Sequence, residues 1–148
     1  MSLKNLSARN KIPNQYKVKL SNRRVNQIYK KFENSFNIDT NFIVAVSGGA
    51  DSLALAFLTK LFALKNNLNP KYYIVDHKLR KESTREAFKV KKVLSSLDII
   101  SQILTVRGNK PQNRTQSFAR KKRYNLLFSK CKKLNNNKFR FICKFSGI

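Results

Sequence analysis

Short apolar runs alternate with longer segments of helical periodicity from about residue 39 onward. The apolar runs at 42–46, 71–76, 99–106 and 139–143 have the length and composition of β-strands. Between them, apolar residues recur every three or four positions over about 51–65, 82–96 and 115–134, which predicts three amphipathic helices. This β-α-β-α-β-α-β order predicts an α/β fold, a parallel sheet with crossover helices.

The first 38 residues follow a different pattern. Residues 1 to about 20 are polar and basic, contain Pro13 and show no clear period, which predicts a mobile arm. Apolar side chains recur at helical spacing from residue 23 to 36 and predict one short amphipathic helix. We therefore expect a basic N-terminal arm and short helix over 1–38, followed by the α/β domain over 39–148.

A glycine pair joins the first predicted strand to the next helix. The segment reads Ser47, Gly48, Gly49, Ala50, Asp51, Ser52. Glycine allows a tight turn and close approach of the backbone to a ligand, and the amides that begin a helix attract anions. This is not a Walker A loop, because the glycines are adjacent and no lysine follows. The segment predicts a phosphate-binding loop, and the alternative is a Gly-Gly turn with an Asp or Ser helix cap.

The charge of the chain narrows the choice of partner. The 32 Lys and Arg against 7 Asp and Glu give a net charge of +25. Such self-repulsion predicts a polyanionic partner, with nucleic acid bound first through its phosphates, although compositional drift toward Lys and Asn is an alternative. Asp51 would repel phosphate unless a divalent cation or a cationic substrate lies nearby, so it is a candidate Mg²⁺ ligand.

Two more groups of polar residues are expected at the same edge of the sheet, where α/β proteins bind ligands. Asp76, His77 and Arg80 follow the second strand and are candidates for contacts to a nucleotide or substrate. Arg120 and Arg123 are three residues apart on one helix, so they share a face suited to phosphate or an RNA backbone. The alternatives are a polar loop with a structural histidine and a solvated basic helix face.

Several classes of protein are disfavoured by the residue inventory. Cys131 and Cys143 are too far apart for a Cys-x-x-Cys motif and His77 is the only histidine, so no zinc set can be assembled. Both cysteines are expected to stay reduced in a cytoplasmic protein. The N-terminus lacks the apolar core of a signal peptide, and no run of about 18 apolar residues predicts a membrane span.

Three motifs carry a resemblance to a known family. The Ser-Gly-Gly-x-Asp-Ser loop at 47–52 resembles the signature of the N-type ATP pyrophosphatases, or PP-loop proteins. The Asp-His-x-Leu-Arg stretch at 76–80 and the Gln-x-x-Ala-Arg-x-x-Arg-Tyr pattern at 116–124 resemble more particularly the tRNA(Ile)-lysidine synthetases. The likeness extends from about residue 39 to 134.

The resemblance implies a Rossmann-like fold of the adenine nucleotide alpha hydrolase type, with ATP and Mg²⁺ as cofactors. In this family ATP adenylates the C2 oxygen of the wobble cytidine in the CAU anticodon of tRNA(Ile), and free L-lysine then displaces AMP. The implied ATP-binding residues are Ser47, Gly48, Gly49, Ala50, Asp51 and Ser52. The implied catalytic residues are Asp51, Arg120 and Arg123.

The end of the sequence departs from the family pattern. The family continues after the fourth strand into an Ala-His-His-x-x-Asp-Asp segment, whereas residues 143–148 read Cys-Lys-Phe-Ser-Gly-Ile. We therefore expect a truncated domain, the N-terminal fragment of a longer ligase, with incomplete catalytic machinery. Two alternatives remain open. One is another PP-loop tRNA-modifying enzyme of the cytidine thiolase type, which would need paired cysteines, and the other is a basic RNA-binding fragment without catalysis.

Overall fold

The structure, a computed structural model, describes residues 12–107, 116–133 and 140–142. The elements are α1 (Asn14–Ser21), α2 (Arg23–Ser35), β1 (Phe42–Val46), α3 (Ala50–Asn66), β2 (Lys71–Asp76), α4 (Ser83–Ser96), β3 (Ser101–Thr105), α5 (Gln116–Lys133) and β4 (Arg140–Ile142). The strands form one parallel sheet in the order β3-β2-β1-β4. This confirms the predicted α/β fold with crossover helices.

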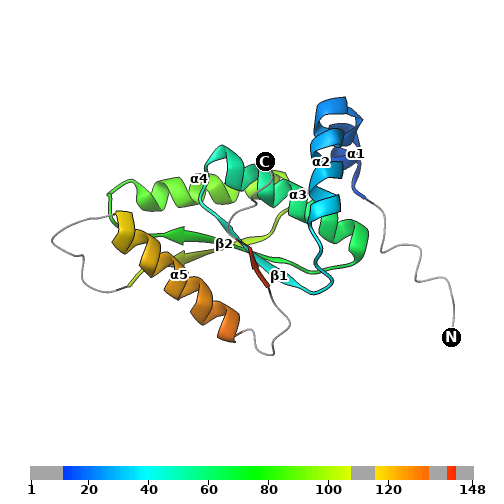
Figure 1. Cartoon of the computed structure of the whole chain (residues 1–148). Coiled ribbons are helices and arrows are strands. Elements are labelled where there is room, and N and C mark those ends of the chain that lie inside the picture. Colours follow the sequence, from blue (N-terminus) through cyan, green and yellow to red (C-terminus); the bar gives the residue numbers. More distant parts are fainter. Residues whose placement is uncertain (1–11, 108–115, 134–139, 143–148) are drawn as a thin grey trace, which may run out of the picture.

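Helices cover both faces of the sheet (Figure 1). On one face, α2, α3 and α4 pack on side chains from β1, β2 and β4, which are Phe42, Val44, Val46, Tyr72, Ile74 and Ile142. On the other face, Leu127 of α5 packs against Ile43, Ala45, Tyr73 and Leu104. Successive side chains of a strand point to opposite faces of the sheet. Since helices cover both faces, all five residues of β1 are buried.

The N-terminal helices share the larger of these two cores. The mobile arm predicted up to about residue 20 is wrong for α1, because Tyr16 of this helix is only 1% exposed. The Tyr16 ring stacks on Phe57 with 5.2 Å between centroids, and its hydroxyl donates a hydrogen bond to the carbonyl of Leu97. The predicted second helix is confirmed as α2, and the division of the chain at residue 39 stays a prediction.

α2 begins at a side-chain cap and ends in an aromatic cluster. The Asn22 side-chain oxygen accepts hydrogen bonds from the amides of Arg24 and Val25 at 3.0 and 3.3 Å, which satisfies donors that the first turn leaves unpaired. At the other end, Phe32 and Phe36 meet Phe62 of α3 edge-on. These contacts attach α2 to the helix that follows the glycine pair.

The amphipathic helix predicted over about 82–96 is confirmed as α4, but not all of its apolar side chains face the sheet. Ala87 and Leu94 are buried, but Phe88 and Val93 are 60% and 43% exposed and point away from the sheet. β3 is also shorter than the predicted strand at 99–106, and the outer residues of the predicted strand at 139–143 lie outside the described residues. Within the described ranges, no helix is both long and apolar enough to cross a membrane.

Candidate functional site

The site forms at the carboxyl end of β1, in the middle of the sheet. The chain leaves β1 into α3 on one face of the sheet, whereas it enters β4, the neighbour of β1, from α5 on the opposite face (Figure 1). Ligands of open α/β sheets bind where the connections diverge in this way. A cavity of about 660 Å³ lies there, within the usual size range of small-molecule sites. Its polar and charged lining includes Ser47, Asp51, Ser52, His77, Arg80, Ser83, Glu86, Arg120 and Arg123.

The loop between β1 and α3 depends on glycine at its second position. Gly48 has a φ of +92°, a backbone conformation that residues with a Cβ rarely adopt. A Cβ placed there would also lie 2.4 Å from Cγ2 of Val90 on α4. At Gly49 the nearest atom to an added Cβ is the Ser47 hydroxyl oxygen at 3.9 Å. Gly48 therefore lets the loop pass close beneath α4.

Backbone donors of this loop converge on one point. The amides of Ser47 and Gly48 donate to the hydroxyl oxygen of Ser52 at 3.2 and 3.1 Å, and this oxygen is also 3.1 Å from the Ser47 hydroxyl. The Ser52 hydroxyl in turn donates to the carbonyl of Gly49 at 2.9 Å. The loop thus curls around a single oxygen, an arrangement suited to an anion.

The start of α3 adds to this donor array. Its N-cap is Gly49, which has no side chain to accept a hydrogen bond from the first turn. The amides at this end of a 17-residue helix carry the positive end of the helix dipole. Asp51 lies in the first turn, is exposed and lines the cavity. The start of α3 therefore combines backbone donors with the carboxylate of Asp51.

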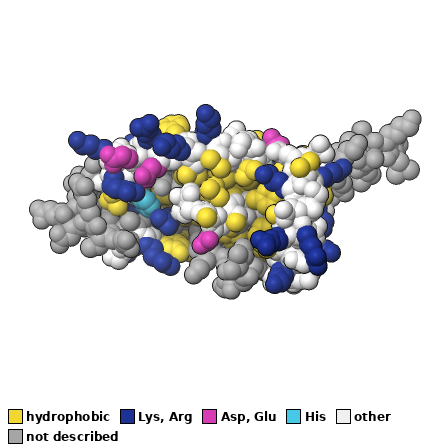
Figure 2. Space-filling view, turned by 90° about the horizontal axis from the view of Figure 1, so that it is seen from above, with side chains coloured by type: hydrophobic (Ala, Val, Ile, Leu, Met, Phe, Trp, Pro, Cys, Tyr) yellow, Lys and Arg dark blue, Asp and Glu magenta, His cyan; other side chains and the backbone are white. Residues whose placement is uncertain are grey.

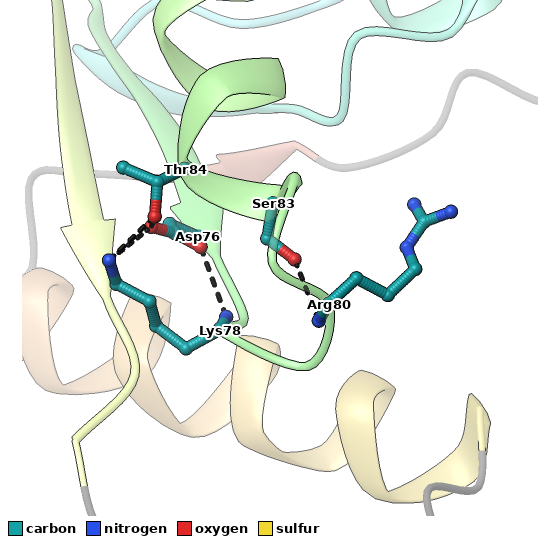
Figure 3. Close-up of polar contacts among 5 residues, drawn as sticks. All are labelled: Asp76, Lys78, Arg80, Ser83 and Thr84. Carbon is teal, nitrogen blue, oxygen red and sulfur yellow. Dashed lines mark hydrogen bonds and ion pairs between the residues drawn. The ribbon is translucent and has the colours of Figure 1, made fainter.

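Asp76 holds the loop after β2 instead of facing the cavity. It is 2% exposed and is not among the cavity-lining residues. Its carboxylate accepts hydrogen bonds from the amide of Lys78 at 3.0 Å and from the hydroxyl of Thr84 at 2.8 Å (Figure 3). The Lys78 ammonium lies 3.5 Å from the same carboxylate. These contacts fix Lys78, whose φ is +54°, and attach the loop to the first turn of α4.

The charge of Asp76 is stabilised by these partners. Burial by itself raises the pKa of a carboxyl group, because it disfavours the charged form. Here the hydrogen bonds from Lys78 and Thr84 and the nearby ammonium more than offset burial, and the net pKa of Asp76 lies below its ordinary value of 3.8. Asp76 is therefore ionised at neutral pH and acts within the fold.

His77 makes a contact between the β2 loop and α5. Its Nε2 atom lies 3.0 Å from Nη2 of Arg123, and its Nδ1 atom is buried without a hydrogen-bond partner in the described part of the chain. Burial lowers the pKa of His77 below its ordinary value of 6.5, and the charge of Arg123 lowers it further, while Asp76 acts in the opposite direction. The imidazole is therefore neutral at physiological pH.

Two more arginines, Arg80 and Arg120, line the cavity. Arg80 is exposed and forms an ion pair of 3.1 Å with Glu86 of α4, while its amide donates to the hydroxyl of Ser83 (Figure 3). The Arg120 guanidinium lies 5.6 Å from the centroid of the Tyr124 ring, within cation–π range. On the face of the molecule that Figure 2 shows, Lys, Arg and acidic side chains gather around the histidine at one end.

The structure thus brings together the three groups expected from the sequence. Every candidate residue except Gly48 and Asp76 lines the cavity, and Gly48 contributes a backbone amide to the loop. The roles of Lys78, Thr84 and Glu86 were not expected, because a polar residue near a helix start gives no sign of the partner it will meet. Among the described residues, no group of three or more His, Cys, Asp or Glu side chains could hold a metal ion.

A comparison with protein families identifies the domain that carries this site. A family model described as the PP-loop domain matches residues 18–142, which include every candidate residue above. The chain belongs to the PP-loop family. Membership of the family supports the use of ATP. The loop at 47–52 is the candidate PP-loop of this domain and is called the PP-loop from here on.

Several curated relatives of this PP-loop chain carry the name tRNA(Ile)-lysidine synthase. The chain is similar to the protein of Bartonella henselae, with 43% identity over 93 residues, which is 62% of this chain and 19% of the relative. It is also similar to those of Rickettsia akari (37% over 110 residues) and Rickettsia bellii (35% over 117 residues), covering 70% and 73% of this chain. The chain spans only 26% of the length of each of these Rickettsia proteins.

Proposed function

We propose that this chain forms the ATP-binding part of a tRNA(Ile)-lysidine synthase and holds the nucleotide triphosphate in the PP-loop. The observation that carries the proposal is the convergence of the Ser47 and Gly48 amides on one oxygen inside a cavity that Arg120 and Arg123 also line. The names of the curated relatives support the choice of substrate. The chain would then act in the cytoplasm on tRNA(Ile) with a CAU anticodon.

The proposed adenylation needs a site for a leaving pyrophosphate. The C2 oxygen of the wobble cytidine attacks the α-phosphorus of ATP, and the bond from this phosphorus to the bridging oxygen of pyrophosphate breaks. Negative charge then develops on the departing oxygens. The α3 N-terminus, which has no side-chain cap, presents preorganised donors to this charge, and such donors lower a barrier most when they need no rearrangement. The Ser47 and Gly48 amides can add to them once a phosphate oxygen takes the place of the Ser52 hydroxyl.

The second step joins lysine to the base. One amine of free L-lysine, in its neutral form, attacks C2, the C2–O bond to the adenylate breaks, AMP leaves and the amine loses a proton to water. Arg120 and Arg123 carry permanent positive charges that can hold the α-phosphate of the departing AMP or the tRNA backbone. Asp51 has the opposite charge and, in place of a metal ion, can hold the second amine of lysine, which stays protonated.

The residues present fit one Mg²⁺ ion only together with the substrate. Asp51 is the one carboxylate of the PP-loop, and Mg²⁺ in nucleotide sites is commonly held by one or two carboxylates together with substrate phosphates. When bound, the ion would neutralise charge on the triphosphate. No cage built from protein ligands alone is required by the proposal.

Two alternatives make different predictions. A thiolase-type PP-loop enzyme needs paired cysteines, and Cys131 and Cys143 are not in a Cys-x-x-Cys motif. A basic module that binds RNA without catalysis fits the charge of +25 but gives no role to the convergent donors of the PP-loop. Binding of ATP separates the proposal from this second alternative.

The deciding experiment is calorimetric titration of the chain with Mg-ATP. Ser52→Ala removes the hydroxyl that organises the PP-loop, so we expect affinity to fall by about tenfold, in line with the loss of one or two hydrogen bonds. Ser96→Ala is the matched control, because its hydroxyl donates only to the Val93 carbonyl at the far end of α4. Equal affinity in the unaltered chain and in both variants would contradict binding at the PP-loop.

A further inference from the structure

We propose that His77 is a positioning residue, which fixes the Arg123 guanidinium in the ATP cavity and does not itself contact the nucleotide. The inference rests on the proposed function for its ligand, but its central contact is a property of the free chain. The Nε2 atom of His77 lies 3.0 Å from Nη2 of Arg123. Arginine has donors and no acceptor, so Nε2 must be the unprotonated acceptor of this hydrogen bond.

The chemistry of the imidazole leaves it little to offer a ligand. With Nε2 unprotonated, a neutral ring carries its proton on Nδ1. The Nδ1 atom is buried and has no partner within the described ranges. One nitrogen is thus occupied by Arg123 and the other is closed off from the cavity. A direct hydrogen bond from His77 to ATP would require the contact with Arg123 to break.

The loop that carries His77 is itself held on both sides. Asp76, on one side, is buried and accepts hydrogen bonds from Lys78 and Thr84. Lys78, on the other side, is fixed in the left-handed conformation by the first of these bonds. Residue 77 therefore lies in a turn that the contacts of its two neighbours attach to the start of α4; Figure 3 shows these contacts of Asp76, Lys78 and Thr84.

The contribution of Arg123 to ligand affinity should increase when a contact within the protein already orders its side chain. It reaches the cavity from α5, on the face of the sheet opposite α3 and α4. A free arginine side chain has many rotamers, and ordering it on binding reduces affinity. One hydrogen bond to His77 uses a single N–H group and leaves the other guanidinium donors available for phosphate. His77 thus prepares Arg123 before the nucleotide arrives.

Substitutions at residue 77 distinguish positioning from packing. In His77→Gln the side-chain carbonyl oxygen can reach the place of Nε2 and accept from Arg123. In His77→Leu the side chain still fills space but offers no acceptor. We expect Mg-ATP affinity to fall by about three- to tenfold in His77→Leu, the range for one lost hydrogen bond, and by less than about twofold in His77→Gln.

A double-mutant cycle with Arg123→Ala tests whether His77 acts through Arg123. We expect His77→Leu to cause no further loss of Mg-ATP affinity once Arg123 is absent. Losses that multiply in the double variant, or an equal loss in His77→Gln and His77→Leu, would overturn the proposal. Circular dichroism and thermal melting of each variant establish that the chains compared are folded.

The contact itself can be measured without ATP. Nitrogen-15 NMR of the free chain, in which His77 is the only histidine, reports which ring nitrogen carries the proton. We expect the Nδ1–H tautomer, together with a changed Nε2 shift in Arg123→Ala. The Nε2–H tautomer would overturn the positioning role. Failure of the unaltered chain to bind Mg-ATP, with the Nδ1–H tautomer present, would instead count against the proposed function alone.

Discussion

Gly48 is the residue whose replacement the structure tolerates least in the PP-loop. Its φ of +92° and the 2.4 Å approach of an added Cβ to Val90 act together, because both the backbone and the neighbouring helix would have to shift. We expect Gly48→Ala to lower the free energy of unfolding by about 2–4 kcal/mol, the sum of backbone strain and overpacking. Urea unfolding followed by circular dichroism measures this change.

Gly49→Ala is the control for this prediction. Its φ is −70°, and an added Cβ has nothing closer than 3.9 Å, so we expect a loss of no more than about 1 kcal/mol, the cost of Ala in place of Gly at an N-cap. The double variant Gly48→Ala, Val90→Ala should recover the part of the loss that comes from the clash, corrected for Val90→Ala alone. Equal stability of Gly48→Ala and Gly49→Ala would show that the loop does not pass beneath α4.

His77 gives the chain a pH-dependent stability. Its pKa in the folded state is lowered by burial and then by Arg123, so the unfolded state binds more protons than the folded state as pH falls below about 6.5. Arg80 and Arg120 add positive charge to the cavity that His77 lines, whereas Glu86 of the same cavity and the buried neighbour Asp76 add negative charge. We therefore expect the free energy of unfolding to decrease between about pH 7.5 and about pH 5.5, measured by urea unfolding at each pH.

The variant His77→Gln isolates this effect, because glutamine does not titrate and the chain has no other histidine. We expect its stability to change less than that of the unaltered chain over the same pH range. Parallel pH dependence in the two proteins would mean that protonation of His77 is equally easy in the folded and unfolded states, contrary to its burial against Arg123.

At the scale of elements, the connection between β2 and α4 depends on the carboxylate of Asp76. Asp76→Asn keeps the shape and one acceptor but removes the charge that Lys78 and Thr84 face. We expect a loss of about 1–3 kcal/mol in the free energy of unfolding at neutral pH. The folded-state pKa lies below 3.8, so this stabilisation is present above that pH and is lost as pH falls through the folded pKa.

Urea unfolding at neutral and at acid pH measures both parts of the Asp76 prediction. Asp39→Asn is the matched control, since Asp39 is exposed and lies ahead of β1, away from the cavity lining. The cost of Asp76→Asn should shrink at acid pH, whereas Asp39→Asn should be near neutral throughout. A cost for Asp76→Asn that does not vary with pH would mean that its charge contributes nothing.

The elements that sequence patterns predict best are those whose signal is local. The apolar runs of β1 and β2 give their bounds directly, and the glycine pair identifies the turn into α3. α1 was missed because Tyr16 is its one buried side chain, so no helical period is visible in its sequence. Asp76 was expected to contact a ligand for a similar reason, since its partners Lys78 and Thr84 are recognisable only once the loop is folded.

At the scale of the whole molecule, the excess of positive charge has no internal compensation. The chain has 32 Lys and Arg but only 7 Asp and Glu, so even complete one-to-one pairing would leave 25 cationic side chains without a carboxylate. In the described residues, one of those carboxylates, Asp76, is already committed to a buried contact. A surface of this kind attracts a polyanion at long range, and salt weakens that attraction.

The affinity for tRNA should therefore depend steeply on salt. We expect binding of a fluorescently labelled tRNA, measured by anisotropy, to weaken by about 10³-fold or more between about 50 and 200 mM KCl, the loss typical of six to ten phosphate contacts. Mg-ATP is the internal control, because a single triphosphate in the PP-loop displaces far fewer counterions and should bind with a much shallower salt dependence. An RNA affinity as insensitive to salt as that for Mg-ATP would mean that the excess charge does not serve nucleic-acid binding.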